Sequence, residues 1–227
     1  MTVEGADVRE SRALAKILAN PDDNAPRLAY AAWLDRHGDP ILAEFIRVQI
    51  EEEKASFLHR SDRGYQLWQV HRKEWELPVR TALGLPARCP GRVFLQFTRG
   101  FVDTIRALGR DRAALVVDRA ETLFTLAPIQ ELILWGQWDR EPDPYGDCPQ
   151  IYDPFGQDTL RELVRKPCFS SLRSLDLGGN RIGDEGAELL LSAEHLGPSC
   201  KLDVSNNDIS SGMIAKLRTR YQVRYYG

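Results

Sequence analysis

The feature that most constrains the fold of this chain is a pattern of apolar residues that recurs after 27 residues in its C-terminal part. Leu172, Leu175 and Leu177 are followed by Asn180 and Ile182. The positions 27 residues later hold Ser199, Leu202, Val204, Asn207 and Ile209, so only the first of them departs from the apolar pattern. A period of this length is typical of stacked structural repeats, in which each unit buries its apolar face against its neighbours. We therefore expect a repeat architecture here.

The run 172–182 resembles the leucine-rich repeat, because it fits the template L-x-x-L-x-L-x-x-N-x-L with Ile182 as the last leucine. Two earlier units share the register, and their leading positions hold Ile129, Leu132 and Leu134 in one and Val102, Ile105 and Ala107 in the other. Leu132 and Leu175 are 43 residues apart instead of 27, which assigns 16 additional residues to an insertion at about 135–158. Gln137 stands in that unit where the template has asparagine.

The resemblance implies the longer strand-helix repeat type, similar to that of ribonuclease inhibitor. Helices are expected after the strands at 111–126, 158–165, 184–196 and 210–218. Each of these ranges begins with a residue that can cap a helix, namely Asp111, Asp158, Asp184 and Ser210. Asn180 and Asn207 are predicted to be buried after their strands, where an amide can satisfy backbone groups of neighbouring coils.

The N-terminal part has helical instead of strand periodicity. Apolar residues predict helices over 8–19, from about Asn24 to Gly38, and over 40–54, and a fourth helix between 55 and 90 that ends at Pro78. Asn24 is the expected cap of the second helix. Glycines and prolines at 84–91 mark a linker, and the β-branched and aromatic residues at 93–95 and 100–102 predict strands.

The runs Ile17–Leu34, Gly38–Pro40 and Glu44–Gln49 together resemble the bacterial repeat-companion domain, which usually precedes repeats. Ala32 stands where that family usually has aspartate before the Trp-Leu pair. The resemblance covers about a fifth of the chain and implies a context beside repeats, without implying an activity.

These patterns together predict an α+β fold, in which an N-terminal helical bundle caps a short right-handed leucine-rich-repeat solenoid with parallel strands. The expected domains are residues 1–90 and 91–227, with the insertion inside the second. The four expected strands lie within 102–107, 132–135, 172–177 and 202–204.

The composition argues against several function classes. Lysine and arginine number 30 against 33 aspartates and glutamates, so the net charge of -3 gives no global reason to expect nucleic acid or a membrane as partner. The four cysteines are far apart, and the histidines are scattered without a zinc, phosphate-loop or nucleophile motif. We expect no cofactor, no metal, no catalysis and a cytoplasmic location.

The remaining function is binding, most simply of another protein. Side chains between the repeat leucines are expected to share one face of the sheet, and the insertion adds aromatic residues that can anchor an interface. The predicted partner-binding residues are Arg106, Glu131, Ile133, Trp135, Trp138, Tyr145, Ser174, Asp176, Lys201 and Asp203. The aromatic residues of the insertion could instead fold into a local core, and both alternatives stay open.

Nucleic-acid binding is the alternative function. Six arginines occur between Arg88 and Arg112, and the C-terminus interleaves basic residues with Tyr221, Tyr225 and Tyr226. Such residues can contact phosphates and stack on bases. A basic surface for an acidic protein partner is the competing interpretation.

Overall fold

The computed structural model describes residues 3–54, 62–86, 92–136, 154 and 156–226. The chain divides into two compact units. Unit 1 comprises Met1–Ala87, Gln96–Asp103 and Phe124–Pro128, and unit 2 comprises Arg88–Leu95, Thr104–Leu123 and Ile129–Gly227. Two short segments beyond residue 90 thus belong to the N-terminal unit. Each unit is described by itself below.

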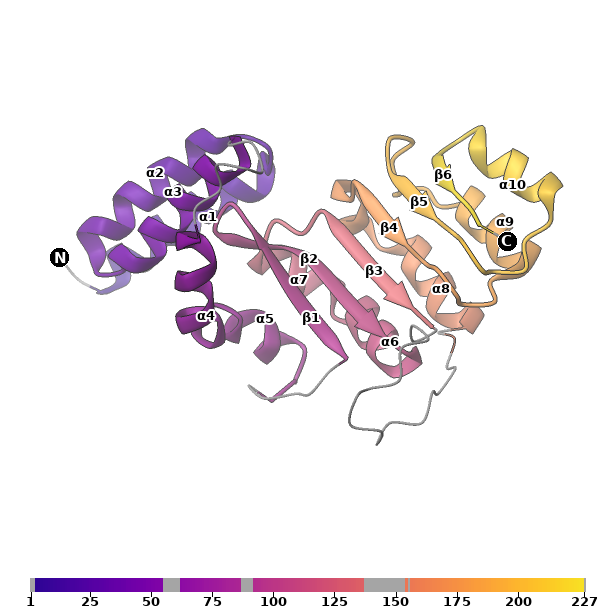
Figure 1. The fold of residues 1–227 in the computed structure, drawn as a ribbon, viewed down its shortest axis with the longest axis horizontal. Helices are drawn as coiled ribbons and strands as arrows, with labels where there is room; N and C mark the ends of the chain where they lie inside the picture. Colours follow the sequence, from indigo (N-terminus) through magenta and orange to yellow (C-terminus); the bar gives the residue numbers. More distant parts are fainter. Residues whose placement is uncertain (1–2, 55–61, 87–91, 137–153, 155, 227) are drawn as a thin grey trace. The chain divides into compact units, whose positions relative to one another are not determined.

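Unit 1 begins with the helices α1 (Val3–Ala19), α2 (Asn24–His37) and α3 (Pro40–Lys54), drawn in indigo and violet in Figure 1. The bounds of α3 agree with the sequence prediction, whereas α1 starts earlier than expected. Asp23 caps α2, because its carboxylate accepts the Ala25 N–H at 2.8 Å; the prediction of Asn24 as the cap was therefore wrong by one position. Gly38 ends α2 in the left-handed conformation, with a φ of 110°.

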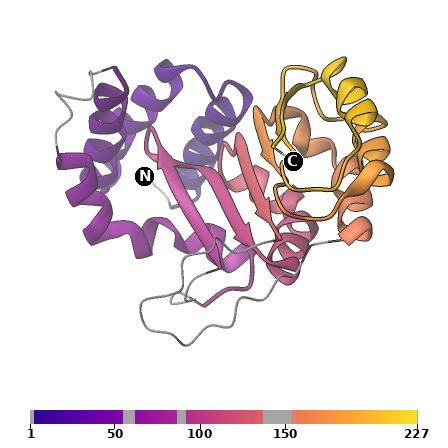
Figure 2. The same ribbon diagram turned by 45° about the vertical axis from the view of Figure 1, so that its right-hand side comes forward.

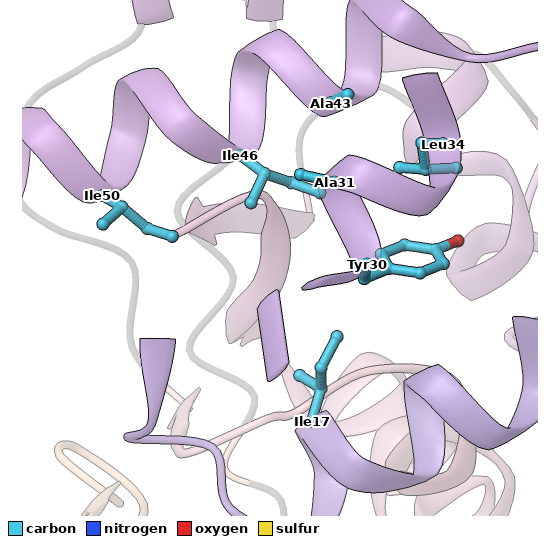
Figure 3. Close-up of a cluster of buried hydrophobic side chains, with 7 residues drawn as sticks. All are labelled: Ile17, Tyr30, Ala31, Leu34, Ala43, Ile46 and Ile50. Carbon is cyan, nitrogen blue, oxygen red and sulfur yellow. The ribbon is translucent and has the colours of Figure 1, made fainter. Parts of the chain in front are cut away.

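The three helices share a cluster of buried apolar side chains, shown in Figure 3. Its buried members are Ile17 of α1, Tyr30, Ala31 and Leu34 of α2, and Ala43, Ile46 and Ile50 of α3. Burying a side chain of the size of leucine or isoleucine contributes about 1.5–3 kcal/mol. The i, i+3 and i+4 spacing of these residues is the reason that short helices can pack together here.

The fourth expected helix is two helices, α4 (Arg63–Trp75) and α5 (Leu77–Ala82). Pro78 does not end a helix, because it lies in the first turn of α5. Proline is tolerated there, since the first N–H groups of a helix have no acceptor within the helix. The prediction of one helix that closes at Pro78 was therefore wrong.

The strands β1 (Val93–Thr98) and β2 (Phe101–Leu108) are neighbours in the sheet and are joined by the two-residue turn Arg99-Gly100. A connection this short permits only an antiparallel pair. Gly100 has a φ of 86°, a conformation that glycine adopts without strain. The tip of this hairpin, residues 96–103, belongs to unit 1, and the remainder of both strands belongs to unit 2.

Unit 2 contains most of a six-stranded, mainly parallel sheet in the order β1-β2-β3-β4-β5-β6 (Figure 1). Its later strands are β3 (Glu131–Trp135), β4 (Ser174–Asp176), β5 (Lys201–Asp203) and β6 (Gln222–Arg224). The four strands expected from the sequence lie side by side, with Ile105, Leu132, Leu175 and Leu202 in one register. The strand β6 was not predicted.

Helices alternate with these strands. They are α6 (Arg110–Asp118), α7 (Ala120–Leu126), α8 (Gly156–Arg165), the 3₁₀ helix η2 (Pro167–Ser171), α9 (Gly183–Leu191) and α10 (Ser211–Arg218). In Figure 2, α6, α8, α9 and α10 follow one another along one side of the sheet. The expected helix 111–126 is interrupted at Arg119. Of the expected caps, Ser210 accepts the Met213 N–H at 3.3 Å, but α6 and α9 begin without a side-chain cap, so Asp111 and Asp184 were wrongly assigned.

Asn180 and Asn207 connect successive repeats of unit 2 through buried hydrogen bonds. Their side chains are 2% and 0% exposed. The Asn180 amide donates to the carbonyl of Leu134 at 2.6 Å, and the Asn207 amide donates to the carbonyl of Leu177 at 2.8 Å. The Asn207 side-chain oxygen accepts the Asn180 backbone N–H at 2.8 Å. The predicted structural role of both asparagines is confirmed.

Candidate protein-binding surface

The strands of unit 2 present two rows of mostly polar side chains on one face of the sheet, which we call the polar face. Parallel pairing places one residue of each strand in each row. The first row is Thr104, Glu131, Ser174, Lys201 and Gln222, and the second row is Arg106, Ile133, Asp176, Asp203 and Arg224. The residues that alternate with them, such as Leu132, Leu175 and Leu202, are buried on the other face. Sequence spacing alone predicted this alternation.

The polar face differs in accessibility from residue to residue. Lys201 and Arg106 are exposed, and Glu131, Ser174 and Asp176 are half-buried. Ile133 is only 8% exposed, so its side chain offers little surface to a partner, although the sequence placed it among the contact residues. The accessible part of the face is therefore charged and polar.

Trp135 is fixed within the polar face by two neighbours. The Arg106 guanidinium lies over the indole ring, 5.2 Å from its centroid. Asp176 accepts a hydrogen bond from the Trp135 side chain and a second one, at 2.9 Å, from the Gly178 N–H. Trp135 is thus half-buried and held between Arg106 and Asp176.

Asp176 and Asp203 are adjacent on β4 and β5. Burial raises the pKa of Asp176 above its usual value, and the charge of Asp203 adds to the rise, while hydrogen bonds from Gly178 and Trp135 oppose it. Asp203 accepts the Ser205 N–H at 2.9 Å and lies 3.4 Å from the Arg224 guanidinium. Both carboxylates therefore have partners within the protein.

A shallow groove of about 410 Å³ crosses the polar face from β3 to β6. Residues of both rows line it, including Glu131, Lys201 and Asp203. Gln222 and Arg224 of β6 also line it, and neither was predicted to lie on this face. The available signal was weak, because Val223 is the only apolar residue of β6 and follows Leu202 at a spacing shorter than the repeat.

Trp138 and Tyr145 lie outside the described residues, as does most of the insertion at 135–158. The two alternatives for its aromatic residues, partner contact and local core, remain predictions.

The arginines between 88 and 112 do not share one environment. Arg99 is 6% exposed and donates to the carbonyl of Asp22 at 3.0 Å. Arg106 lies over Trp135, and Arg110 donates to the carbonyl of Pro154 at 3.0 Å. Arg88 is outside the described residues. Arg106 and Arg110 are exposed, whereas the buried Arg99 is not available to phosphates, so the charge excess of this segment counts one arginine that does not belong to its surface.

The C-terminal aromatic residues are also mainly structural. Tyr221 is 5% exposed, and its hydroxyl donates to the carbonyl of Leu190 at 2.8 Å. The Tyr225 hydroxyl donates to the carbonyl of Ile209 at 3.2 Å. Tyr226 alone of the three is exposed, at 62%, with the Arg224 guanidinium 5.1 Å from its ring centroid. A continuous stacking platform for bases is not formed by these three rings.

The described cysteines are protonated thiols at neutral pH. Burial, with help from Glu121, raises the pKa of Cys168 to about 12, and burial raises the pKa of Cys200 to about 11. Cys148 lies outside the described residues. Within the described ranges, no group of three or more His, Cys, Asp or Glu side chains could hold a metal ion. No helix among the described residues has the length and apolar character needed to cross a membrane.

Comparison with known proteins supports the repeat at one place. Residues 170–191 match the family model described as a Leucine Rich repeat. This segment includes β4, Asn180 and all of α9, which together make one strand-turn-helix unit. No curated protein and no solved structure matches the chain significantly.

Proposed function

We propose that this protein is a non-catalytic protein-binding module, such as an adaptor, scaffold or regulatory subunit. In this proposal, the repeats of unit 2 form a short right-handed leucine-rich-repeat solenoid, and the polar face contacts the partner. Leucine-rich-repeat domains generally mediate protein–protein interaction, and one segment matches such a repeat. The observation that carries the proposal is the alignment of two polar rows on one face of the sheet.

The distribution of charge on the polar face suggests how a partner is recognised. Arg106 lies on β2, Asp176 lies near the centre, and Lys201 and Arg224 lie on β5 and β6. Neighbouring strands are about 4.8 Å apart, so the distance across four steps is about 19 Å. A partner that complements this face carries basic groups at its centre and acidic groups at both ends.

Aromatic and arginine side chains supply the remaining contacts in this proposal. Trp135, held by Arg106, and Tyr226, beside Arg224, combine residue types that often dominate interface energies. Trp138 and Tyr145 stay in the proposed contact set as aromatic residues of the insertion. Glu131, Ser174 and Asp203 complete it along the groove.

Charge reversal on the polar face tests this function. The protein is first used to capture partners from its native host, and a partner that is captured reproducibly is then purified for affinity measurements. Lys201→Glu is expected to weaken binding by about fivefold or more, which corresponds to about 1 kcal/mol. Lys216→Glu is the matched control, because Lys216 is an exposed lysine of α10 in the same unit. Equal affinities for both variants and the wild type would contradict the proposed surface.

The salt dependence of binding separates this proposal from nucleic-acid binding. Phosphate contacts release counterions, so the affinity for nucleic acid falls steeply as salt rises. A protein interface with aromatic anchors is expected to weaken less. Capture of RNA or DNA with a steep salt slope, and of no protein, would overturn the proposed function.

A further inference from the structure

The hairpin tip within unit 1 is held by a set of contacts that are specific for its sequence. The Gly100 N–H donates to the Gln49 side-chain oxygen at 2.7 Å. The Gln49 amide in turn donates to the carbonyl of Phe97 at 3.3 Å. One side chain of α3 therefore binds the backbone of the turn, at Gly100, and of the strand before it, at Phe97.

Gly100 is required at this turn for two separate reasons. Its φ of 86° disfavours residues with a side chain. A Cβ atom at this position would lie 2.2 Å from Ile46 Cγ1 and 3.0 Å from the Ile46 Cα atom. The second distance involves the α3 backbone, which a rotamer change cannot move. The surface of α3 around Ile46 therefore leaves room only for glycine at position 100.

Arg99 is bound through both its side chain and its main chain. Its guanidinium donates to the carbonyl of Asp22 at 3.0 Å and lies 3.5 Å from the Glu53 carboxylate. Its carbonyl accepts a hydrogen bond from Arg27 at 3.3 Å. Arg27 is fully buried and also donates to the carbonyl of Pro21 at 2.9 Å. Each guanidinium thus directs several N–H donors at two separate groups: Arg99 at Asp22 and Glu53, and Arg27 at Arg99 and Pro21. The compact ammonium group of lysine cannot reproduce this planar arrangement of donors.

Aromatic residues flank the turn on both strands. Phe97 packs with its ring centroid 6.0 Å from Phe45 and 6.5 Å from Trp75. Phe101 packs 5.8 Å from Tyr30, and the Arg27 guanidinium lies 5.1 Å from its ring centroid. Such ring pairs contribute beyond the area that they bury.

We propose that the helices of unit 1 form a recognition site for a β-hairpin tip of the pattern aromatic-x-Arg-Gly-aromatic, and that residues 97–101 of this chain are its ligand. Most of the contacting side chains lie within the runs 17–34 and 44–49, which carry the resemblance to the repeat-companion domain. The site assigns a role to this unit that is independent of the proposed partner of unit 2. Its role is to bind the hairpin tip, residues 97–101, within unit 1.

Hydrogen exchange of the full chain tests the proposed site. Gly100→Ala and Gly84→Ala both place a side chain at a positive φ within unit 1, but a Cβ on Gly84 meets no atom within 4 Å. We expect amides of α2 and α3 to exchange about tenfold faster in Gly100→Ala than in Gly84→Ala, because only the former expels the tip. Equal exchange rates in the two variants would overturn the proposal.

A second pair of variants avoids the steric clash and therefore also covers the case in which Gly100→Ala fails to fold. Arg99→Lys keeps the charge and removes the guanidinium fork, and Arg92→Lys makes the same change at an exposed position of the hairpin base. Faster exchange of α2 and α3 only in Arg99→Lys is the expected result. If Arg99→Lys exchanged as slowly as Arg92→Lys, the tip would not be recognised by its sequence and the proposal would fail.

Discussion

Replacing Asn207 by alanine should destabilise unit 2 more than any replacement of an exposed residue there. The side-chain oxygen of Asn207 accepts the backbone N–H groups of Asn180 at 2.8 Å and Ile182 at 3.2 Å. Each buried N–H that loses its acceptor costs about 1–3 kcal/mol, so the two together give about 2–6 kcal/mol. The carbonyl of Leu177 keeps a donor in Asn180, at 2.9 Å, and adds little to this cost. We therefore expect a loss of about 3–5 kcal/mol.

Native-state hydrogen exchange of the amides in β3, β4 and β5 measures this loss in the unit concerned. Asn206→Gly is the control, because Asn206 is an exposed neighbour with a φ of 56°, which glycine accepts without strain. The control should change the free energy of unfolding by less than about 0.5 kcal/mol. A loss below about 1 kcal/mol in Asn207→Ala would refute the argument that its hydrogen bonds hold successive repeats together.

Four further predictions concern the polar face and the core. Leu175→Ala should lower the free energy of unfolding of unit 2 by about 2–5 kcal/mol, measured by denaturant titration, because Leu175 is fully buried. Trp135→Ala should weaken capture of the protein partner while the far-UV circular dichroism spectrum stays unchanged; unchanged affinity would exclude Trp135 from the interface. Because the pKa of Asp176 is raised on folding, its contribution to stability is largest at acidic pH and is lost as the pH rises through the folded pKa. The free energy of unfolding of Asp176→Asn should therefore increase relative to that of the wild type as the pH rises from about 4 to about 7. A difference between the two proteins that decreases over this range would contradict the raised pKa of Asp176. Cys168 should react with iodoacetamide at pH 8 much more slowly in the folded protein than after denaturation, as followed by mass spectrometry, since its pKa is raised to about 12.

The sheet of unit 2 could be predicted because its signals repeat. Leu175 and Leu202 alternate with polar residues at a spacing of 27, and Leu132 fits the same register once the insertion is allowed for, so one register explains all three strands. The two buried asparagines follow from the same template. By contrast, β6 carries only Val223 as an apolar residue. The positions that correspond to Leu172 and Leu177 hold Arg220 and Tyr225, so the repeat template does not extend to this strand.

Other features depend on contacts that no local pattern encodes. The interruption at Arg119 lies inside a segment whose apolar spacing fits one continuous helix. Asp111 and Asp184 were wrongly predicted as the N-caps of α6 and α9, because both lie inside the first turn of their helices. A carboxylate in the first turn interacts favourably with the helix dipole without being the N-cap residue.

The contacts of the hairpin tip in unit 1 could not be predicted from the sequence either. From the sequence, Arg99 counted toward a basic surface, yet its guanidinium is buried against Asp22. More than 70 residues separate these two partners, so their contact could not be inferred from spacing. Net charge over a segment describes a surface only when the side chains are exposed.

Site-specific photo-crosslinking tests the proposed binding surface most directly. A photoreactive amino acid is placed at position 201 on the polar face or at position 216 on α10, and each protein is irradiated in its native host. The proposal predicts a crosslink to one protein partner from position 201 and none to that partner from position 216. A partner crosslinked only from position 216, or equally from both, would contradict recognition by the polar face.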